Sequence, residues 1–455
     1  MKKKIILGIV AICVVIGIVI CIFPYVKYFF EDLLYKSQFT SQETEFTFED
    51  INDTTFIEKD CYNALKLTIK NSEINDLDFM NLPYLRIVNF ENCTYTGEPI
   101  DINNNYFSFI TFDYCDYDFI KNFENAEVTN LQILRTELND LTYIAENFKN
   151  INFLTLYLSN VKSMKGIQNI TTLETLNLYG VFSEDIWLIK NLTNLKELRF
   201  SYLSVDDISF IKDMPLTVLS LDNLHRLRNL DFITEMPTLK EIEIYGCEMA
   251  CSEELITRLN EMKNNSTNVI NFEEDTVRIQ KEIYNLVNTL VTDSMTDREK
   301  IEKTVTYVCD LMTYDSRVMM NELFKESGED AEDDSVAAII SQYDRFALRN
   351  ALNGNGVCLN YTALISALLN EMGINTYSIN NANHIWNLVE IDGEYLWLDV
   401  TSIDTSSIQY ESLEKNPSYL APITDPNFVS QLFSFPLEIY DEVYYAFQLS
   451  KEMLK

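Results

Sequence analysis

Three residues in the last third of the chain have side chains suited to catalysis by a thiol: Cys358, His384 and Asp399. Two glycines form a turn just before Cys358, and the apolar residues that follow recur at helical spacing as far as Gly373. This pattern predicts a buried helix with Cys358 in its first turn. Because the positive end of a helix dipole stabilises a thiolate, the sequence predicts a nucleophilic cysteine.

His384 is one of two histidines in the chain and opens a pair of alternating strands joined by Asp392 and Gly393. Asp-Gly is a strong signal for a two-residue hairpin turn. With that turn, the predicted pairs are Ile391 with Glu394, Leu388 with Trp397, Trp386 with Asp399, and His384 with Thr401. Asp399 then lies on the face of His384, where its carboxylate can hold the imidazole in the tautomer that accepts the thiol proton. The other histidine, His225, is interpreted as a surface residue.

The segments Gly-Val-Cys358, His384-x-Trp-Asn and Leu-Asp399-Val-Thr resemble the motifs of the transglutaminase-like superfamily, over about residues 299–404. The resemblance implies a papain-like α+β fold, with Cys358 as nucleophile, His384 as base and Asp399 as the acid that orients the base. It also implies a thioacyl intermediate formed from glutamine side chains or peptide bonds, and it leaves crosslinking, deamidation and peptide hydrolysis open. Two positions depart from the family pattern: Asn360 replaces a glycine and Ser402 an aromatic residue that many bacterial members carry.

The group that would stabilise an oxyanion in such a reaction stays open at this stage. The backbone amide of Cys358 is one candidate, and a side chain from 341–345, such as Gln342 or Tyr343, is another. Trp386 is a possible supporting residue beside the histidine. We expect no metal and no cofactor, because no CxxC pair is present and the acidic run at 326–334 lacks the ordered ligands and hinge glycine of a calcium loop.

A repeat precedes these motifs. The pattern apolar-x-x-apolar-x-apolar recurs every 21 to 23 residues, with its middle apolar position at Leu65, Val88, Ile110, Leu131, Leu154, Leu176, Leu198, Leu219 and Ile242. Each unit predicts a short strand and a compact return segment, and stacked units share one core. The spacing and the Asn-Leu-Thr-Asn-Leu segment at 191–195 resemble the short leucine-rich repeat of bacterial internalin-like surface proteins. The asparagine expected after each strand is mostly missing, so some strands are expected to be irregular, and the helical segment 252–262 is expected to cap the array.

The strands of such an array line a concave face that presents side chains to a partner. Here that face offers Thr155, Tyr157, Asn177, Tyr179, Arg199, Ser201, Ser220, Glu243 and Tyr245. Two roles for the array are open: recognition of a ligand that the sequence does not identify, or a spacer. The whole chain likewise has two interpretations, an acyl-transfer enzyme or a catalytically silent leucine-rich repeat adhesin or scaffold. The intact triad favours the enzyme.

Composition and the N-terminus predict location and partners. The net charge of −35, from 70 acidic and 35 basic residues, disfavours nucleic acid as a partner. Three lysines at positions 2–4 precede an uncharged stretch at 5–26, which is long enough to cross ~30 Å of hydrocarbon as a helix. We therefore expect a single-pass protein of the cell membrane, with its N-terminus in the cytoplasm and its body outside. Secretion after cleavage of a signal peptide is the alternative.

Together these signals predict an α+β papain-like, transglutaminase-like catalytic domain joined to an α/β leucine-rich repeat solenoid, with an N-terminal transmembrane helix. The expected partners are a protein or peptide substrate, a ligand on the concave repeat face and the membrane. The expected segments are a cytoplasmic tail at 1–4, a membrane anchor at 5–26, a linker and repeat cap at 27–59, the repeats at 60–265, the catalytic domain at 276–410 and a C-terminal extension packed on it at 411–455.

Overall fold

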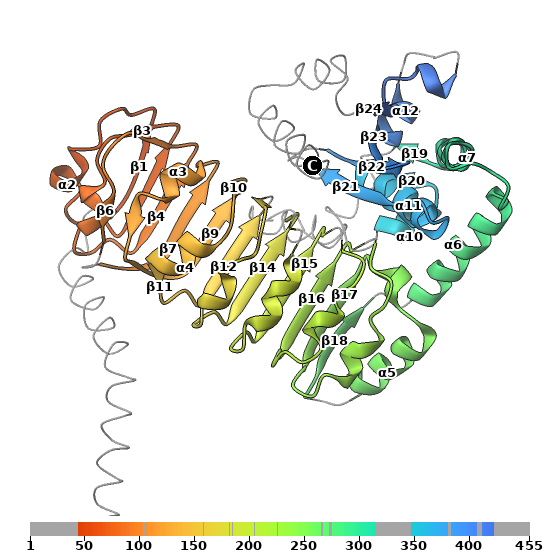
Figure 1. Ribbon diagram of the computed structural model, residues 1–455, viewed down its shortest axis with the longest axis horizontal. Helices are drawn as coiled ribbons and strands as arrows, with labels where there is room; N and C mark the ends of the chain where they lie inside the picture. Colours follow the sequence, from red (N-terminus) through yellow and green to blue (C-terminus); the bar gives the residue numbers. More distant parts are fainter. Residues whose placement is uncertain are drawn as a thin grey trace, which may run out of the picture.

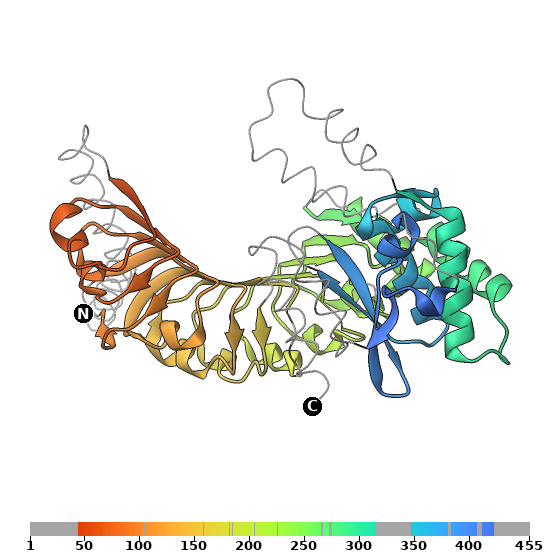
Figure 2. The same cartoon turned by 90° about the horizontal axis from the view of Figure 1, so that it is seen from above.

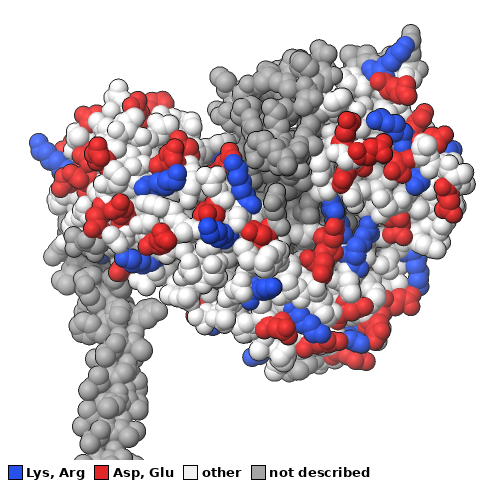
Figure 3. Space-filling view, in the orientation of Figure 1, with Lys and Arg blue, Asp and Glu red and all other residues white. Residues whose placement is uncertain are grey.

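The computed structural model describes residues 44–422 apart from 103–104, 158, 182, 184, 204, 225, 265–266, 273–274, 315–346, 381–383 and 407–411. Several predictions fall outside the described residues. They concern the segment 5–26, His225, the acidic run 326–334, Gln342, Tyr343 and residues 423–455. The described chain forms two parts, a long repeat array and a C-terminal part that lies at the β18 end of the array (Figure 1). Acidic side chains are spread over both parts (Figure 3).

The structure contradicts the prediction of a single-pass membrane protein. Among the residues that the structure describes, no helix is long and apolar enough to cross a bilayer. The longest of these helices, α6 (Thr276–Leu290) and α7 (Asp297–Leu311), have 15 residues each, whereas a membrane span needs about 20 apolar residues. The segment 5–26, on which that prediction was based, lies outside the described residues.

A parallel sheet of 12 strands forms the array, and Figure 2 shows it bent into an arc. In the five-residue repeat strands the second and fourth residues are buried and the others half-buried. This alternation sends one set of side chains into the shared core and the other to the opposite face. In order, the strands are β1 (Glu45–Glu49), β2 (Lys66–Lys70), β4 (Ile87–Glu91), β7 (Tyr106–Asp113), β9 (Ala126–Leu134), β12 (Phe153–Tyr157), β14 (Thr175–Tyr179), β15 (Glu197–Ser201), β16 (Val218–Asp222), β17 (Glu241–Tyr245) and β18 (Val269–Phe272), with β11 (Phe148–Lys149) beside β9.

Short helices and two-stranded ladders return the chain from one strand to the next. They cover the core face of the sheet and contribute buried residues such as Phe79, Phe119 and Ile189. The helical segments are α2 (Ile57–Asp60), η1 (Asp78–Asn81), α3 (Tyr117–Ile120), α4 (Thr142–Asn147), η2 (Ile167–Asn169), η3 (Ile186–Asn191), η4 (Ser209–Ile211), η5 (Asp231–Glu235), η6 (Glu248–Ala250) and α5 (Glu253–Lys263). The small ladders pair β3 (Glu73–Ile74) with β5 (Thr94–Tyr95), β6 (Ile100–Asp101) with β8 (Phe123–Glu124), and β10 (Glu137–Leu138) with β13 (Asn160–Val161). The array is a leucine-rich repeat solenoid of the α/β type.

The register of the strands confirms eight of the nine predicted repeat positions, from Val88 to Ile242. The first is wrong by two residues, because Val88 pairs with Leu67 and not with Leu65. Leu65 and Leu67 are both leucines two residues apart, so the apolar pattern alone did not separate the two registers. The helix predicted at 252–262 is present as α5, but it does not end the array, since β18 follows it and pairs with β17.

Left-handed residues and short polar side chains follow the strands where asparagine was expected. The residue directly after the strand has a positive φ at Asp50, Asn71, Asn92, Tyr114, Arg135, Gly180, Tyr202, Asn223 and Gly246. One position further, a thiol or hydroxyl donates a hydrogen bond to a carbonyl of the preceding repeat: Cys93 Sγ to Ile69 at 3.3 Å, Cys115 Sγ to Phe90 at 3.7 Å and Ser159 Oγ to Ile133 at 3.2 Å. Irregularity does occur in β7 and β9, which have eight and nine residues and interrupt the burial alternation once.

The C-terminal part places one buried helix against an antiparallel sheet. Helix α7 begins with a capping box, in which Thr296 and Glu299 exchange hydrogen bonds. Helix α11 (Cys358–Glu371) is buried from Leu359 to Asn370 and contacts α6, α7 and the sheet. The sheet has the order β21 (Thr376–Asn380), β22 (Ile385–Ile391), β23 (Glu394–Leu398) and β24 (Tyr419–Pro422). The remaining elements are β19 (Thr313–Tyr314), α10 (Ala347–Leu352), β20 (Asn355–Gly356), α12 (Val400–Thr405) and η8 (Leu413–Lys415).

Candidate active site

Cys358 is the first residue of α11, as the glycine turn and the apolar pattern predicted. A buried asparagine, Asn360, holds the turn that precedes it. The Asn360 Oδ1 atom accepts a hydrogen bond from the amide of Val357 at 2.8 Å, and its Nδ2 donates one to the carbonyl of Ala347 at 2.9 Å. A Cβ at Gly356 would lie 2.3 Å from Asn360 Oδ1, so glycine is needed there. The residue that departs from the family pattern thus fixes the start of the helix.

His384 lies between the other two predicted residues. Its Nε2 is 2.9 Å from Asp399 Oδ2, and its ring also forms a hydrogen bond with the thiol of Cys358. Because Nε2 faces the carboxylate, Nδ1 is the nitrogen available to the thiol. Cys358 and His384 are half-buried, and the side chain of Asp399 is 6% exposed. The structure therefore brings together three residues that are 15 and 26 positions apart along the chain.

The hairpin that carries His384 has the predicted turn. Asp392 and Gly393 have φ values of 53° and 78°, as the two central residues of a type I′ turn require. The ladder contains the predicted pairs Ile391–Glu394 and Leu388–Trp397. The two other predicted pairs are absent from it, because β23 ends at Leu398 and the chain turns into α12. Thr401 is therefore helical, and Asp399 is the residue that caps α12.

Ser402 is a partner of Asp399 that the sequence analysis missed. Its backbone amide donates to Asp399 Oδ1 at 3.1 Å, and its hydroxyl donates to Asp399 Oδ2 at 2.5 Å. With His384, the carboxylate has three donors, which fix its plane. Aspartate is a favoured N-cap residue, whose oxygen accepts a hydrogen bond from an amide two or three positions later, so the bond to the Ser402 amide had a signal in the sequence. The serine that departs from the family pattern thus has a definite contact.

Electrostatics at the site favour a charged imidazole. Burial alone lowers the pKa of His384, but its hydrogen bonds to Asp399 and to Cys358 outweigh this effect and raise the pKa to about 10. The other described thiols lie in different surroundings. Burial, with smaller contributions from Asp404 and Asp310, raises the pKa of Cys309 to about 12, and burial raises that of Cys247 well above its usual value. None of the seven described cysteines forms a disulfide.

Two tryptophans support the histidine from the sheet. Trp386 is 2% exposed. Its ring stacks on His384 with centroids 5.6 Å apart, and the ring of Trp397 packs against it with centroids 4.4 Å apart. The indole N–H of Trp386 has no hydrogen-bond acceptor among the residues that the structure describes. Trp386 therefore fixes the plane of the imidazole, while Gln342 and Tyr343, the other supporting candidates, lie outside the described residues.

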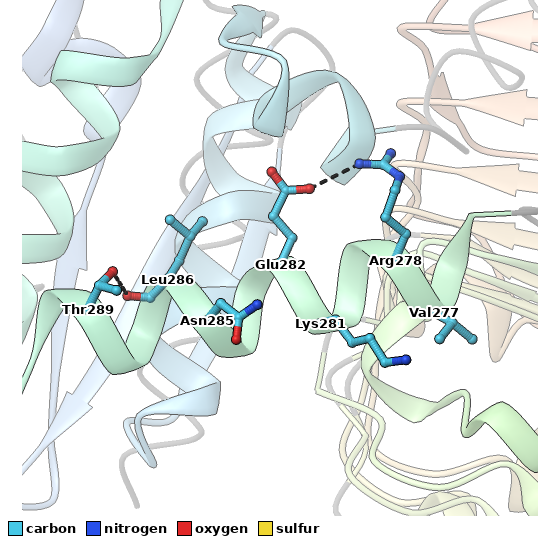
Figure 4. A pocket seen from close by; sticks show the side chains of 7 residues that line it. All are labelled: Val277, Arg278, Lys281, Glu282, Asn285, Leu286 and Thr289. Carbon is cyan, nitrogen blue, oxygen red and sulfur yellow. Dashed lines mark hydrogen bonds and ion pairs between the residues drawn. The ribbon is translucent and has the colours of Figure 1, made fainter.

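A shallow cavity of about 620 Å³ lies along α6, away from the triad (Figure 4). Its lining includes Arg278, Lys281 and Glu282 and none of the three triad residues. The cations there are already paired: Arg278 with Glu282 at 3.0 Å, and Lys281 with Glu253. This hollow has no group suited to nucleophilic chemistry.

No protein-family model and no curated protein matches the chain. Among solved structures, it is similar to an internalin from Listeria monocytogenes, with 12% identity over 50% of this chain and 75% of that one and a TM-score of 0.32. An internalin C2 from the same organism is similar at 17% identity over 38% of this chain and 76% of that one, with a TM-score of 0.27. A TGase is similar at 19% identity over 37% of this chain and 44% of that one, with a TM-score of 0.23. At these identities and TM-scores the comparisons assign no family to the chain.

Proposed function

We propose that this chain is a cysteine-dependent acyl-transfer enzyme of the transglutaminase-like type, whose leucine-rich repeats bind a protein. The observation that carries the proposal is the position of His384, bonded on one side to Asp399 at 2.9 Å and on the other to the thiol of Cys358. A half-buried histidine with a carboxylate on one nitrogen and a thiol on the other is the arrangement that cysteine nucleophiles use.

In the proposed reaction, His384 holds the proton of the Cys358 thiol, and the thiolate attacks a carbonyl carbon of a glutamine side chain or a peptide bond. A carbon–sulfur bond forms, and the carbonyl oxygen carries the negative charge of the tetrahedral intermediate. The carbon–nitrogen bond then breaks as the proton on His384 passes to the leaving nitrogen. Ammonia or an amine departs, and a thioester remains on Cys358.

A second nucleophile releases the acyl group by the reverse sequence of steps. His384 takes a proton from the incoming water or amine, and the thiolate of Cys358 leaves. Water yields a carboxylic acid, so the net reaction is deamidation or hydrolysis. An amine yields a new amide, so the net reaction is crosslinking. The side chains of the triad serve all of these outcomes equally.

The repeat array is a platform for binding. A parallel sheet of this size presents a continuous row of half-buried side chains on the face opposite its core, and such surfaces commonly recognise proteins. The same array supports the alternative, a catalytically silent adhesin or scaffold. That alternative gives no reason for the hydrogen bonds of Ser402, Asp399, His384 and Cys358 to form one connected chain.

Brief alkylation with iodoacetamide near neutral pH, followed by peptide mass mapping of the intact protein, tests the nucleophile. We expect Cys358 to label first, because the start of α11 and the charged imidazole favour its thiolate. Cys309 and Cys247 are expected to label slowly, since burial raises the pKa of both thiols. Equal labelling of Cys309 or Cys247 in the folded protein would contradict the assignment.

The reaction itself is tested with a glutamine-containing peptide, with and without a primary amine. We expect the mass change of deamidation in water and of amide formation with the amine, in a proportion that the measurement determines. Cys358→Ser should abolish both changes while its circular dichroism spectrum stays that of the unchanged protein. Equal product from Cys358→Ser would leave the scaffold as the better interpretation.

A further inference from the structure

The repeat array contacts the segments that hold the candidate nucleophile and base. Tyr202, directly after β15, packs in one apolar cluster with residues of the C-terminal part, namely Ala347, Val357, Leu359, Ala363 and Ile385. Cys358 and Tyr179 pack against the same cluster. Two members of the cluster adjoin Cys358 in sequence, and another directly follows His384. Side chains of the repeats therefore lie next to the triad.

Two arginines of the array hold this arrangement. Arg226 donates hydrogen bonds to Asp206 at 2.7 and 2.8 Å, and its guanidinium lies 4.2 Å from the ring centroid of Tyr377 on β21. Arg228 lies 3.8 Å from the carboxylate of Glu371, the last residue of α11. The array thus contacts α11 near its first residue through Tyr202 and at its last residue through Arg228.

Three tyrosines from consecutive repeats lead to the cluster, and we call Tyr157, Tyr179 and Tyr202 the tyrosine row. Their ring centroids are 4.5 Å apart for the first pair and 5.0 Å apart for the second. Tyr157 and Tyr179 are register partners at the ends of β12 and β14, and both are half-buried. Neighbouring strands lie ~4.8 Å apart, and an extended chain advances ~3.3 Å per residue. The tyrosine row is therefore about as long as three residues of an extended peptide.

The backbone of Tyr202 has a conformation that tyrosine adopts less readily than glycine or asparagine. Its φ is 55°, in the left-handed region. The equivalent positions of the adjacent repeats are Gly180 and Asn223, residues that adopt this conformation readily. A tyrosine does so less readily, so the contacts of its ring in the cluster, beside Cys358, compensate.

Carboxylates adjoin the tyrosine row on the same face of the sheet. Asp222 is in register with Ser201, which is in register with Tyr179. In the next row of the face, Arg199 lies 3.4 Å from Glu243. Glu197, one row further along the sheet, lies 3.9 Å from the same guanidinium. Three acidic side chains therefore accompany one basic side chain on this part of the face.

We infer that the half-buried Tyr157 and Tyr179 of the tyrosine row, together with these carboxylates, bind the substrate of Cys358, and that the substrate is an extended polypeptide segment rich in lysine or arginine. The inference rests on the proposed function and names the substrate class of that site. Aromatic faces attract cations, and the excess of carboxylates attracts the same charges. Because the row ends beside Cys358, a segment bound along it delivers its adjoining residues to the thiol. The array is then a wall of the active site and not a spacer.

Binding is measured by fluorescence anisotropy with the full chain carrying Cys358→Ala, so that no reaction follows. The probe is a labelled peptide of alternating lysine and glutamine, compared with the same peptide in which glutamate replaces lysine. We expect the lysine peptide to bind and the glutamate peptide not to bind at moderate salt. Tyr179→Ala should weaken binding of the lysine peptide about tenfold, whereas Tyr179→Phe, which keeps the ring, should retain it.

Phe109→Ala is the matched control. Phe109 is an aromatic side chain of β7, 37% exposed and two strands away from β12, where the tyrosine row begins, so its removal should leave binding unchanged. Tyr202→Asn, which places the residue of an adjacent repeat in the left-handed position, should weaken binding without a backbone penalty. Binding of both peptides alike, binding of neither, or equal loss in Phe109→Ala and Tyr179→Ala overturns the inference. Failure of Cys358 to alkylate in the unchanged protein overturns the proposed function instead, whatever the peptides do.

Discussion

The charge on His384 depends on two neighbours with different roles. Burial by itself favours the neutral ring, and the hydrogen bonds to Asp399 and Cys358 reverse that preference and raise the pKa of His384 to about 10. At neutral pH the imidazole is therefore protonated. An imidazolium next to a thiol favours the thiolate, which the proposed reaction requires.

The pH dependence of stability tests this charge, and Cys358→Ala isolates it by removing the thiol. In this variant we expect the hydrogen bond to Asp399 to keep the pKa of His384 above its usual value of 6.5. The protonated ring then contributes stability that is complete below about pH 6.5 and is lost as the pH rises through the raised pKa. We expect the free energy of unfolding, from urea titrations, to fall over this range more steeply in Cys358→Ala than in the same protein with His384→Gln. Parallel pH profiles would show that the ring is neutral in the folded protein.

Asp399→Asn tests the orienting role of the carboxylate. The amide keeps the size of the side chain but no longer compensates the charged imidazole or fixes its tautomer. We expect turnover to fall by about 10³–10⁴-fold, as in other triads whose acid is neutralised, with little change in the far-ultraviolet circular dichroism spectrum.

Asp404→Asn is the control for Asp399→Asn. Asp404 accepts a hydrogen bond from the hydroxyl of Tyr361, and an asparagine at that position keeps an acceptor oxygen. It lies five residues beyond Asp399 and is bonded to Tyr361, whereas His384 is bonded to Asp399, so turnover should change little. A large loss in Asp404→Asn together with a small loss in Asp399→Asn would reverse the assignment of the acid.

At the scale of elements, the turn before α11 determines where the thiol lies. Asn360 satisfies an amide on one side of the turn and a carbonyl of α10 on the other, and it is fully buried. We expect Asn360→Ala to lower the free energy of unfolding by about 1–3 kcal/mol, because both backbone groups lose their partner inside the protein. Asn375→Ala is the matched change at an exposed asparagine bonded to Glu390, and it should cost much less. Chemical denaturation of both variants measures the difference, and equal losses would contradict the role of the buried amide.

Local patterns predicted the elements that depend on neighbours in sequence. The Asp392-Gly393 turn sets the hairpin register as far as the pair Asn387–Leu398. Asp399 contacts His384 from the cap of α12 and not from the strand pairing that was predicted for it. The glycine turn and apolar stripe likewise predicted that α11 starts at Cys358. The contact of Ser402 with Asp399 was not predicted. Ser402 stands where many family members have an aromatic residue, and that difference gives no information about a hydrogen bond from its hydroxyl. The proximity of Tyr202 to Cys358 was beyond prediction, because it joins residues more than 150 positions apart and no periodicity relates them.

At the scale of the whole molecule, Arg226 joins the two parts. Its side chain is 10% exposed, and it contacts Asp206 of the array and Tyr377 of the C-terminal sheet. We expect Arg226→Ala to remove a cation–π contact of about 1–2 kcal/mol and to let the C-terminal part unfold at a lower temperature than the array, seen as two calorimetric transitions.

Lys212→Ala is the comparison for Arg226→Ala. Lys212 and Glu235 form an exposed pair within the array, 47% and 55% exposed, and such pairs contribute about 0–1 kcal/mol. One calorimetric transition should persist in Lys212→Ala. A single transition in Arg226→Ala, shifted no more than in Lys212→Ala, would mean that the apolar cluster around Tyr202 joins the parts without help from the arginine.

The position of the apolar cluster also sets limits on how this chain can change in length. Repeats from β1 to β9 touch their neighbours in the array, so a unit can be inserted or deleted there while the distance from Tyr202 to Cys358 stays the same. A unit inserted between β15 and β17 would separate Tyr202 from Arg226 and move α11 away from one of its two supports. The number of repeats is therefore free to vary at the N-terminal end of the array. The last repeats and the C-terminal part must stay together, both in related proteins and when they are transferred to another protein.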